Sequence, residues 1–322
     1  MPLDELDRAI IHALMLDGRA PFNQLADVLG VSQQTVARRY RRMRSDGTLR
    51  VVGMTDPRRT GGVQWFVRLH CTPDAALKVA DALARRNDTS WVQLTSGGTE
   101  IVCIVRTSGG APDTLLLQQL PRTPRVVSVS AHCLLRTFVG GPLAWHWAAA
   151  VLTPDQIRQL TPPPPAEPPT DISADEALLA HLSHDGRTPF ADLATAAGIP
   201  EPTVRRRVRQ LRRSGALYFD VDIDAAALGY TAQALLWLAV PQTALATVAE
   251  ALSQQREVAF AAATTGTTNL VANVLCRDVD ALYTYLTAEI STISGVGHVE
   301  TAPVIRTIKR AATPARTPEG AR

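Results

Sequence analysis

Residues 17–50 read DGRAPFNQLADVLGVSQQTVARRYRRMRSDGTLR, and residues 185–218 read DGRTPFADLATAAGIPEPTVRRRVRQLRRSGALY. The two segments align without a gap at an offset of 168 residues, and about half of the aligned positions are identical. Chance does not produce such a match, so the chain contains the same module twice. The fold can be inferred from one copy and checked on the other.

Each copy has the pattern of a helix-turn-helix. After Asp4, apolar residues recur at helical spacing, which predicts a helix of about three turns. A second helix includes Phe22 and stops at Gly30, because glycine adopts the positive φ that ends a helix. Ser32 can cap a third helix. The side chains that this third helix turns inward are Val36, Tyr40 and Met43.

Polar and arginine side chains occupy the outer face of that third helix in both copies. In a helix-turn-helix this helix enters the major groove, where Gln pairs with adenine and Arg with guanine, and later arginines meet phosphates. A solvated charge run is the alternative, but two like-charged helices after the same turn favour double-stranded DNA as the partner. The predicted DNA-binding residues are Ser32, Gln33, Gln34, Arg38, Arg39, Arg41, Arg42, Glu201, Thr203, Arg205, Arg206, Arg209 and Arg212.

The two copies differ at the start of this helix. Ser32-Gln33-Gln34 in the first copy is replaced by Pro200-Glu201-Pro202 in the second, which removes a hydroxyl cap and adds a negative charge. Glu201 could accept from cytosine N4 or weaken the approach of phosphates. We therefore expect an asymmetric operator, or one strong half and one weak half.

Behind each third helix a short strand-like segment predicts a wing or connector, and the period then changes to the order βαββαβ, the ferredoxin-like motif. The predicted fold class is α+β, with two winged helix-turn-helix domains alternating with two ferredoxin-like domains. A segment of helix and prolines separates the copies and should act as a semi-rigid spacer. The predicted boundaries are 1–60 and 171–228 for the helix-turn-helix domains, 61–140 and 229–310 for the ferredoxin-like domains, 141–170 for the docking helix and linker, and 311–322 for a disordered tail.

The composition fits a globular protein with a formal charge of +3 and a pI near 8.8, which is too mildly basic to indicate nucleic acid by itself. The four cysteines lack CxxC spacing, so a metal or thiol sensor has little support, and we expect no metal and no cofactor. The start of the chain lacks the pattern of a signal peptide, and no apolar run is long enough to span a membrane. We expect a cytoplasmic protein without a membrane partner.

The chain resembles the Lrp/AsnC family of transcriptional regulators. The match rests on LDELDRAII (3–11), the DGR-x-P-F pattern, GVSQQTVARR (30–39), SDGTL (45–49) and the βαββαβ domain behind them, and it spans nearly the whole chain twice. The resemblance implies DNA binding by dimers or higher homo-oligomers, and an amino acid or other small molecule as effector.

The family's effector loop, a Thr-Gly-x-x-Asp turn, maps onto both copies. A plain hairpin turn is the alternative. Glu100 keeps the acid of the pattern, whereas Asn269 lacks the charge that would pair with an ammonium group, so two equivalent amino-acid sites are not expected. The residues that the resemblance assigns to the effector are Ser96, Gly97, Gly98, Glu100, Thr265, Gly266 and Asn269.

An enzyme is the main alternative from another class, because paired modules of this kind also resemble sirohaem decarboxylases. The candidate groups are His70, His132 and His298, but none has neighbours at the spacing of a metal site or an acid-base pair. The sequence therefore predicts a regulator without catalytic residues that is not an enzyme.

Overall fold

The computed structural model describes residues 3–108, 119–141, 145–168 and 170–311. The sequence predicts the second helix of the first βαββαβ motif at 111–119, which lies almost entirely outside these residues, as does the predicted tail at 311–322 apart from Ala311. The chain forms two compact units, each built from both copies. Unit 1 contains residues 1–61 and 141–228, and unit 2 contains residues 62–140 and 229–322.

Unit 1 holds two helix-turn-helix modules with the predicted helices. The first module consists of α1 (Glu5–Leu16), α2 (Phe22–Leu29) and α3 (Gln33–Ser45), and the second of α7 (Glu176–His184), α8 (Phe190–Ala197) and α9 (Glu201–Arg213). Gly30 and Gly198 end α2 and α8 in the left-handed conformation, with φ of 68° and 67°. Ser32 caps α3 by accepting a hydrogen bond from the backbone N–H of Thr35. The predicted helix boundaries are therefore confirmed.

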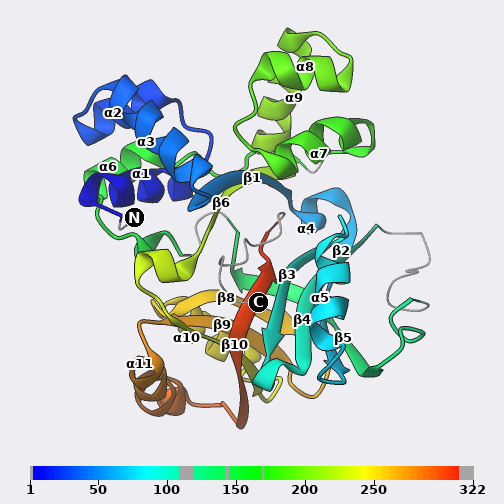
Figure 1. The fold of residues 1–322 in the computed structure, drawn as a ribbon. Coiled ribbons are helices and arrows are strands. Elements are labelled where there is room, and N and C mark those ends of the chain that lie inside the picture. The colour runs from blue at the N-terminus through cyan, green and yellow to red at the C-terminus, as the bar shows by residue number, and fades with distance from the viewer. Residues whose placement is uncertain (1–2, 109–118, 142–144, 169, 312–322) are drawn as a thin grey trace. The chain divides into compact units, whose positions relative to one another are not determined.

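The two modules are joined by a two-stranded antiparallel ribbon (Figure 1). Strand β1 (Leu49–Thr55) pairs along its whole length with β6 (Leu217–Ile223). Val52 lies opposite Asp220, its own counterpart at the offset of 168 residues, so the ribbon has a local twofold axis. Of the two roles that the sequence leaves open, the observed one is that of a connector, because each strand pairs with the other copy.

The segment between the copies packs onto the first module. A 3-10 turn at His146–Ala148 and helix α6 (Pro154–Leu160) lie against α1, and α6 also contacts α2. Helix α1 is consequently buried around most of its circumference rather than on one face. The prolines were predicted to form a spacer, but the backbone N–H groups of Ala166 and Glu167 donate to the carbonyl of Arg213, so this stretch is held against the end of α9.

Unit 2 is a closed eight-stranded barrel made of two ferredoxin-like halves. The first half contains β2 (Gly62–Cys71), α5 (Ala76–Ala84), β3 (Thr89–Thr95), β4 (Glu100–Ser108) and β5 (Val126–Val139). The second contains β7 (Ala232–Ala239), α10 (Leu245–Ser253), β8 (Val258–Thr264), β9 (Leu270–Cys276), α11 (Val279–Thr284) and β10 (His298–Lys309). Strand β5 pairs with β8, and β10 pairs with β3, so neither half keeps a free sheet edge.

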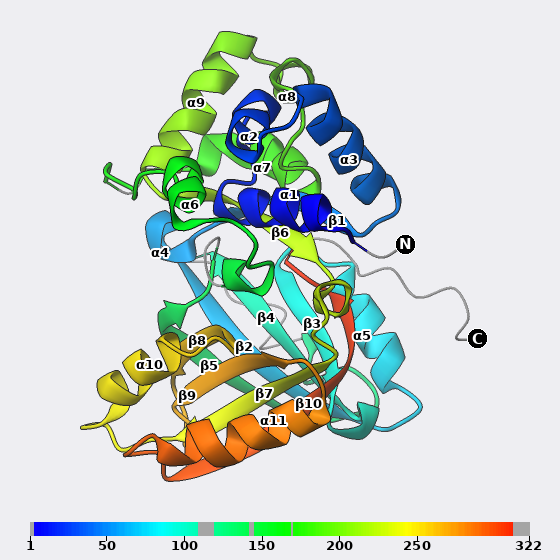
Figure 2. The same ribbon diagram turned by 90° about the vertical axis from the view of Figure 1, so that its left-hand side faces the viewer.

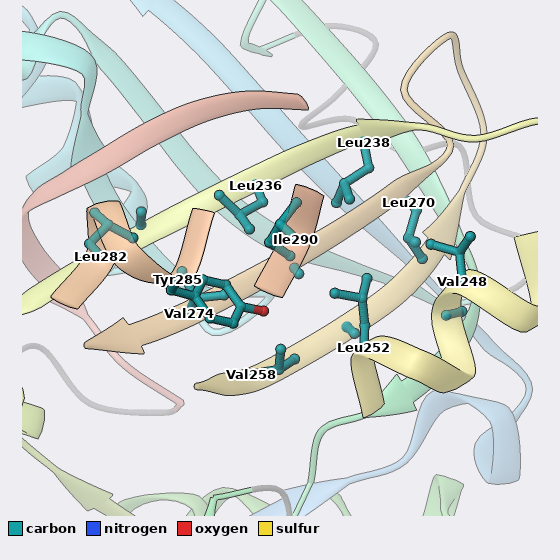
Figure 3. Packing of buried hydrophobic residues seen from close by; sticks show 14 of the residues in the cluster. Leu236, Leu238, Val248, Leu252, Val258, Leu270, Val274, Leu282, Tyr285 and Ile290 are labelled. Atoms are coloured by element: carbon teal, nitrogen blue, oxygen red, sulfur yellow. The ribbon is translucent and has the colours of Figure 1, made fainter. Parts of the chain in front are cut away.

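Helices of the second half cover the outer side of its strands (Figure 2). Val248 and Leu252 of α10 pack on Leu270 and Val258, while Leu282 and Tyr285 lie over Leu236 and Val274 (Figure 3). A separate cluster inside the barrel joins both halves through the edge-to-face contact of Phe66 with Trp237, whose ring centroids are 5.0 Å apart. The α+β class predicted from the sequence is confirmed. In the described part of the chain, every helix is too short or too polar to cross a bilayer.

Candidate nucleic-acid interface

Most arginines of α3 and α9 fall into three groups, and each group has members in both modules. Arg205 and Arg213 stand apart, because they pair with Glu201 of the same helix and with Glu167 of the linker. The first group is exposed and has no carboxylate partner among the described residues. Its members are Arg38 and Arg41 in the first module and their counterparts Arg206 and Arg209 in the second. Arg41 donates only to the Ala37 carbonyl of its own helix. These four guanidinium groups are free to meet an anionic partner.

The second group holds each module together. Arg39 pairs with Asp4 and Asp7, and Arg42 pairs with Asp7 at 2.5 Å. Asp7 itself is fully buried in α1, and these arginines are its cationic partners. Arg207 binds Asp175 in the same way at 2.6 Å. Arg39 and Arg42 were predicted to bind DNA, but in this structure they connect the first helix of the module to the third.

The third group joins the two modules. Arg44 of the first module pairs with Asp185 of the second at 2.7 Å, and Arg212 pairs with Asp17 at 2.9 Å. Each of these ion pairs is the counterpart of the other at the offset of 168 residues. Arg212 was also predicted to bind DNA, and its guanidinium is instead engaged with the opposite module.

The first turns of the two helices present different chemistry. Gln33 and Gln34 are exposed, whereas the Ser32 hydroxyl is occupied as the helix cap and by Thr35. In the second module Glu201 pairs with Arg205 at 2.5 Å, and Arg205 also lies 4.5 Å from the Phe190 ring centroid. Thr203 is half-buried at this turn. The amides of the first module are thus available to base edges, while the glutamate of the second is neutralised by its neighbour.

The sequence reasoning missed Arg19 and Arg187, although both belong to the repeated DGR motif. Arg19 donates to the carbonyls of Gly186 and Thr188 at 2.5 and 2.9 Å. Arg187 returns the same bonds to Gly18 and Ala20 at 2.8 and 2.9 Å. Burial, followed by the nearby charges of Arg187 and Arg212, lowers the pKa of Arg19 to about 10, so its charge persists at neutral pH.

The effector loop predicted in the first half is engaged within the chain. Glu100 is fully buried, and its carboxylate accepts from the Thr95 and Ser96 hydroxyls at 2.7 and 2.8 Å. It also accepts from Nε of Arg68 at 2.6 Å. Gly97 and Gly98, which lie between Ser96 and Glu100, have φ of 77° and 85° and form the tight turn. A ligand at Glu100 would have to displace these donors.

The corresponding loop of the second half has a structural role in this conformation. Both ends of the Asn269 amide bind the backbone of Val240, at 3.0 and 2.8 Å. The Thr265 hydroxyl accepts from the Cys133 N–H, and its carbonyl lies 2.7 Å from Nδ1 of His132. At Gly266 any side chain would meet the His132 ring.

A buried cation also went unnoticed in the sequence. Arg68, whose side chain is only 12% exposed, pairs with Glu100 and with Glu300 of the second half, and lies 4.4 Å from the ring centroid of Trp237. Arg68 and Trp237 are counterparts at the offset of 169 residues in this unit. The Trp237 indole N–H has no acceptor among the described residues, which costs about 1–3 kcal/mol for a buried donor.

The histidines and cysteines do not gather into a metal site in the described part of the chain. His70 lies 3.7 Å from Glu100, while His132 is occupied by Thr265. Cys71, Cys103 and Cys276 are buried thiols, and burial raises the pKa of Cys103 to about 12, which makes it a poor nucleophile.

Comparisons with known proteins agree with this architecture. The AsnC-type helix-turn-helix domain matches residues 3–44 and 173–212, and the Lrp/AsnC ligand binding domain matches residues 233–314. The HTH-type transcriptional regulator FL11 of Pyrococcus horikoshii is 30% identical over 136 residues, which are 42% of this chain and 89% of that protein. Regulatory protein AsnC of Escherichia coli is 30% identical over 146 residues, 42% of this chain and 93% of that protein. The chain belongs to the Lrp/AsnC family, in a tandem form.

A solved structure matches the two copies together. The siroheme decarboxylase NirDL covers 98% of this chain and 95% of its own, with a TM-score of 0.62 and 15% identity. A second NirDL structure, in complex with an iron-uroporphyrin III analogue, gives a TM-score of 0.61. These likenesses show that the tandem fold is shared with an enzyme. They overturn the sequence-based prediction that the chain is not an enzyme, because that prediction rested on the spacing of the histidines along the sequence, whereas the fold as a whole is one that an enzyme also has.

Proposed function

We propose that this protein is a sequence-specific DNA-binding transcriptional regulator. The observation that carries the proposal is the grouping of arginines on α3 and α9. The other arginines of these helices pair with carboxylates of their own helix, their own module, the linker or the neighbouring module. The same two positions in each copy stay exposed and have no such partner in the described part of the chain: Arg38 and Arg41, Arg206 and Arg209.

Four cations without carboxylate partners, at matching positions of the two helices, would suit the anionic backbone of a duplex. Arg38 and Arg206 lie near the first turns and would reach base edges or adjacent phosphates, and Arg41 and Arg209 lie one turn later. Gln33 and Gln34 supply the amides that pair with adenine in the first module, whereas the Glu201–Arg205 pair makes the second module the weaker half. The operator is then asymmetric.

The α+β unit would assemble copies of the chain and respond to a small molecule. Resemblance to the ligand-binding domain of the family supports an amino acid or a related compound as effector. The buried Glu100 of the first half is the only one of the two loop positions that carries a charge, so we place one effector site per chain rather than two. Such a regulator would act in the compartment that holds the DNA.

Salt dependence and arginine substitution test the proposal together. Duplexes are first selected from a random-sequence pool with the full chain, and the affinity is then measured by fluorescence anisotropy. We expect the affinity to fall by roughly 10³-fold between about 50 and 200 mM salt. Replacing Arg38, Arg41, Arg206 and Arg209 together by Ala should abolish selection and flatten the salt response, while Arg158→Ala on α6 should change neither. A wild-type chain that selects no duplex would contradict the proposal.

Decarboxylation of an iron tetrapyrrole is the second candidate, favoured by the match of NirDL to both copies. It predicts that the purified chain binds iron-uroporphyrin with a shifted Soret band that depends on an exposed histidine such as His70 or His298. Titration with iron-uroporphyrin, with and without His70→Ala and His298→Ala, separates the two functions. A saturable shift lost in the variants would favour the enzyme.

A further inference from the structure

We infer that Arg19 and Arg187 are spacing-determining residues: they hold the two helix-turn-helix modules at one separation and orientation, and so restrict the chain to operators with one half-site spacing. The inference rests on the proposed DNA-binding function, but concerns residues that would not touch DNA. The two arginines, together with the pairs Arg44–Asp185 and Arg212–Asp17, are called the inter-module clamp below.

The reciprocity of the contacts is the first step. Arg19 and Arg187 each extend from their own module and donate two bonds to carbonyls of the opposite DGR loop. The planar guanidinium reads two carbonyls at once, so it fixes direction as well as distance. Because both arginines do this, the modules cannot rotate about the ribbon without breaking bonds on one side or the other.

Ring contacts reinforce the same geometry. The Arg19 guanidinium lies 4.3 Å from the ring centroid of Phe190, and the Arg187 guanidinium lies 4.2 Å from that of Phe22. Both phenylalanines begin the second helix of their modules. The clamp therefore contacts α2 and α8 directly. These helices precede α3 and α9, the proposed recognition helices, so a change in their orientation would move the proposed DNA surface.

The positive charges of Arg19 and Arg187 are balanced, and the paired hydrogen bonds are what require arginine at these positions. Burial lowers the pKa of both Arg19 and Arg187. Asp17 and Asp185 compensate the local positive charge, and each also receives an ion pair from the opposite module. Lysine would keep the charge but lose the paired bonds to two carbonyls.

The β1–β6 ribbon alone does not supply this restraint. Two-stranded ribbons twist and bend readily, and an isolated pair of strands is only marginally stable. The clamp adds four charged hydrogen bonds and two ion pairs between the modules. Without them the modules remain connected, and each keeps its fold through its own pairs, Arg39–Asp7 and Arg207–Asp175, but their relative orientation becomes variable.

The test compares the wild type with Arg19→Ala/Arg187→Ala on a series of duplexes. The half-sites of the selected operator are moved together or apart one base pair at a time, which rotates and shifts one half relative to the other. We expect the wild type to lose at least about tenfold in affinity on the first displacement, and the double variant to show less than about a threefold difference across the same series. Arg58→Ala, which removes an exposed arginine paired with Asp56 two residues away, should keep the wild-type profile.

A second readout does not need DNA. Nitroxide labels are placed on Asp27→Cys and Thr195→Cys, counterpart positions exposed on α2 and α8, in a chain whose half-buried Cys133 is replaced by serine. Pulsed electron resonance should give a narrow distance distribution for the wild type and a broad one for the double variant. The Arg19→Lys/Arg187→Lys variant, which preserves charge, should also give a broad distance distribution.

The outcomes separate the two claims. A sharp spacing profile that persists in the double variant overturns the inference, whatever the labels show. If the wild type selects no duplex, the proposed function fails, and the distance distribution alone decides whether the clamp fixes the modules. Should the alanine variant not fold, as judged by circular dichroism, the lysine variant gives the decisive profile.

Discussion

The two units differ in how closely the charged contacts of their two copies match. In unit 1 the same charged contact occurs in both copies: the contacts of Arg39, Arg44 and Arg19 are repeated by their counterparts Arg207, Arg212 and Arg187. In unit 2 the counterparts diverge, since Arg68 corresponds to Trp237 and Glu100 to Asn269. A partner with two similar halves would maintain the first pattern, whereas a single ligand would be enough for the second.

The divergence in unit 2 still obeys physical constraints. Arg68 and Trp237 occupy equivalent positions and contact each other, so a cation from one half rests on the ring of the other. Once Arg68 was buried, its charge had to be neutralised, and Glu100 and Glu300 provide the carboxylates. The lost symmetry is therefore a coupled set of changes.

The largest expected effect breaks this coupled set. Arg68→Met should lower the free energy of unfolding of unit 2 by about 3–5 kcal/mol, because the buried Glu100 loses its cation. Adding Glu100→Gln should restore much of the loss by removing the charge. Denaturant titration of the single and double variants measures the coupling, and simple additivity of the two effects would contradict it.

At the counterpart of Glu100, Asn269→Ala should cost about 1–3 kcal/mol by leaving the Val240 backbone unpaired.

A smaller effect concerns a contact found only in the first module. Nδ1 of His12 lies 3.3 and 3.2 Å from the N–H groups of Val151 and Leu152, and its Nε2 lies 3.0 Å from Nδ1 of His146. Burial, followed by the nearby His146, lowers the pKa of His12 from 6.5 to about 4. As the pH falls, His12 is therefore protonated in the unfolded chain before it is protonated in the folded chain. The stability that depends on neutral His12 is complete above about pH 6.5 and is lost as the pH falls toward 4.

This loss amounts to roughly 3 kcal/mol at most. Thermal unfolding of wild type and His12→Gln at several pH values between 7 and 4 measures it, and the variant should show a shallower acid slope. The counterpart of His12 is Ala180, so the second module lacks the device. His181→Gln, at an exposed histidine of that module, should retain the wild-type slope, and equal slopes in all three proteins would refute the assignment.

The next prediction tests the symmetry of the ribbon. A Cβ added at Gly18 would lie 2.9 Å from Cγ1 of Val51, and one at Gly186 would lie 2.8 Å from Cδ1 of Phe219. Each glycine-to-alanine change should cost about 1–3 kcal/mol by overpacking, and the two costs should be similar. Chemical denaturation measures both. Combining Gly18→Ala with Val51→Ala should cost less than the sum of the separate changes, and a full sum would argue against close approach as the cause.

The smallest effect should appear at the second recognition helix. Glu201→Gln removes a negative charge beside the proposed DNA surface and frees Arg205. Stability should change by less than about 0.5 kcal/mol, since the pair is exposed, while DNA affinity should rise a few-fold. Anisotropy titration checks this, with Gln33→Glu in the first module as the reverse change. A lower affinity for Glu201→Gln would mean that the glutamate itself reads a base.

Much of the local structure could be predicted from the sequence because its signals are local. The helix ends at Gly30 and the cap at Ser32 follow from the chemistry of single residues, and the βαββαβ order follows from changes of period. The pairing of β1 with β6, the closing of the barrel by β5 and β10, and the docking of the linker depend on distant partners. No pattern within one copy contains that information.

The same distinction applies to the candidate interface. A list of arginines on an outward helix face was predictable, but which of them have partners was not, because the carboxylates lie on another helix or in the other module. Asp7 pairs with Arg39 and Arg42, and Asp17 pairs with Arg212. The repeat offered one usable signal: DGR occurs at the same place in both copies, outside any buried helix face, which points to a role for Arg19 and Arg187.

The most direct measurement is the affinity of the full chain for its selected duplex after each exposed pair is removed in turn. Arg38→Ala/Arg41→Ala and Arg206→Ala/Arg209→Ala should each weaken binding by about 10²-fold or more while leaving the circular dichroism spectrum unchanged, with Arg158→Ala as the control. Affinities within about twofold of the wild type for both pairs, on every duplex tried, would contradict the assignment of α3 and α9 to DNA.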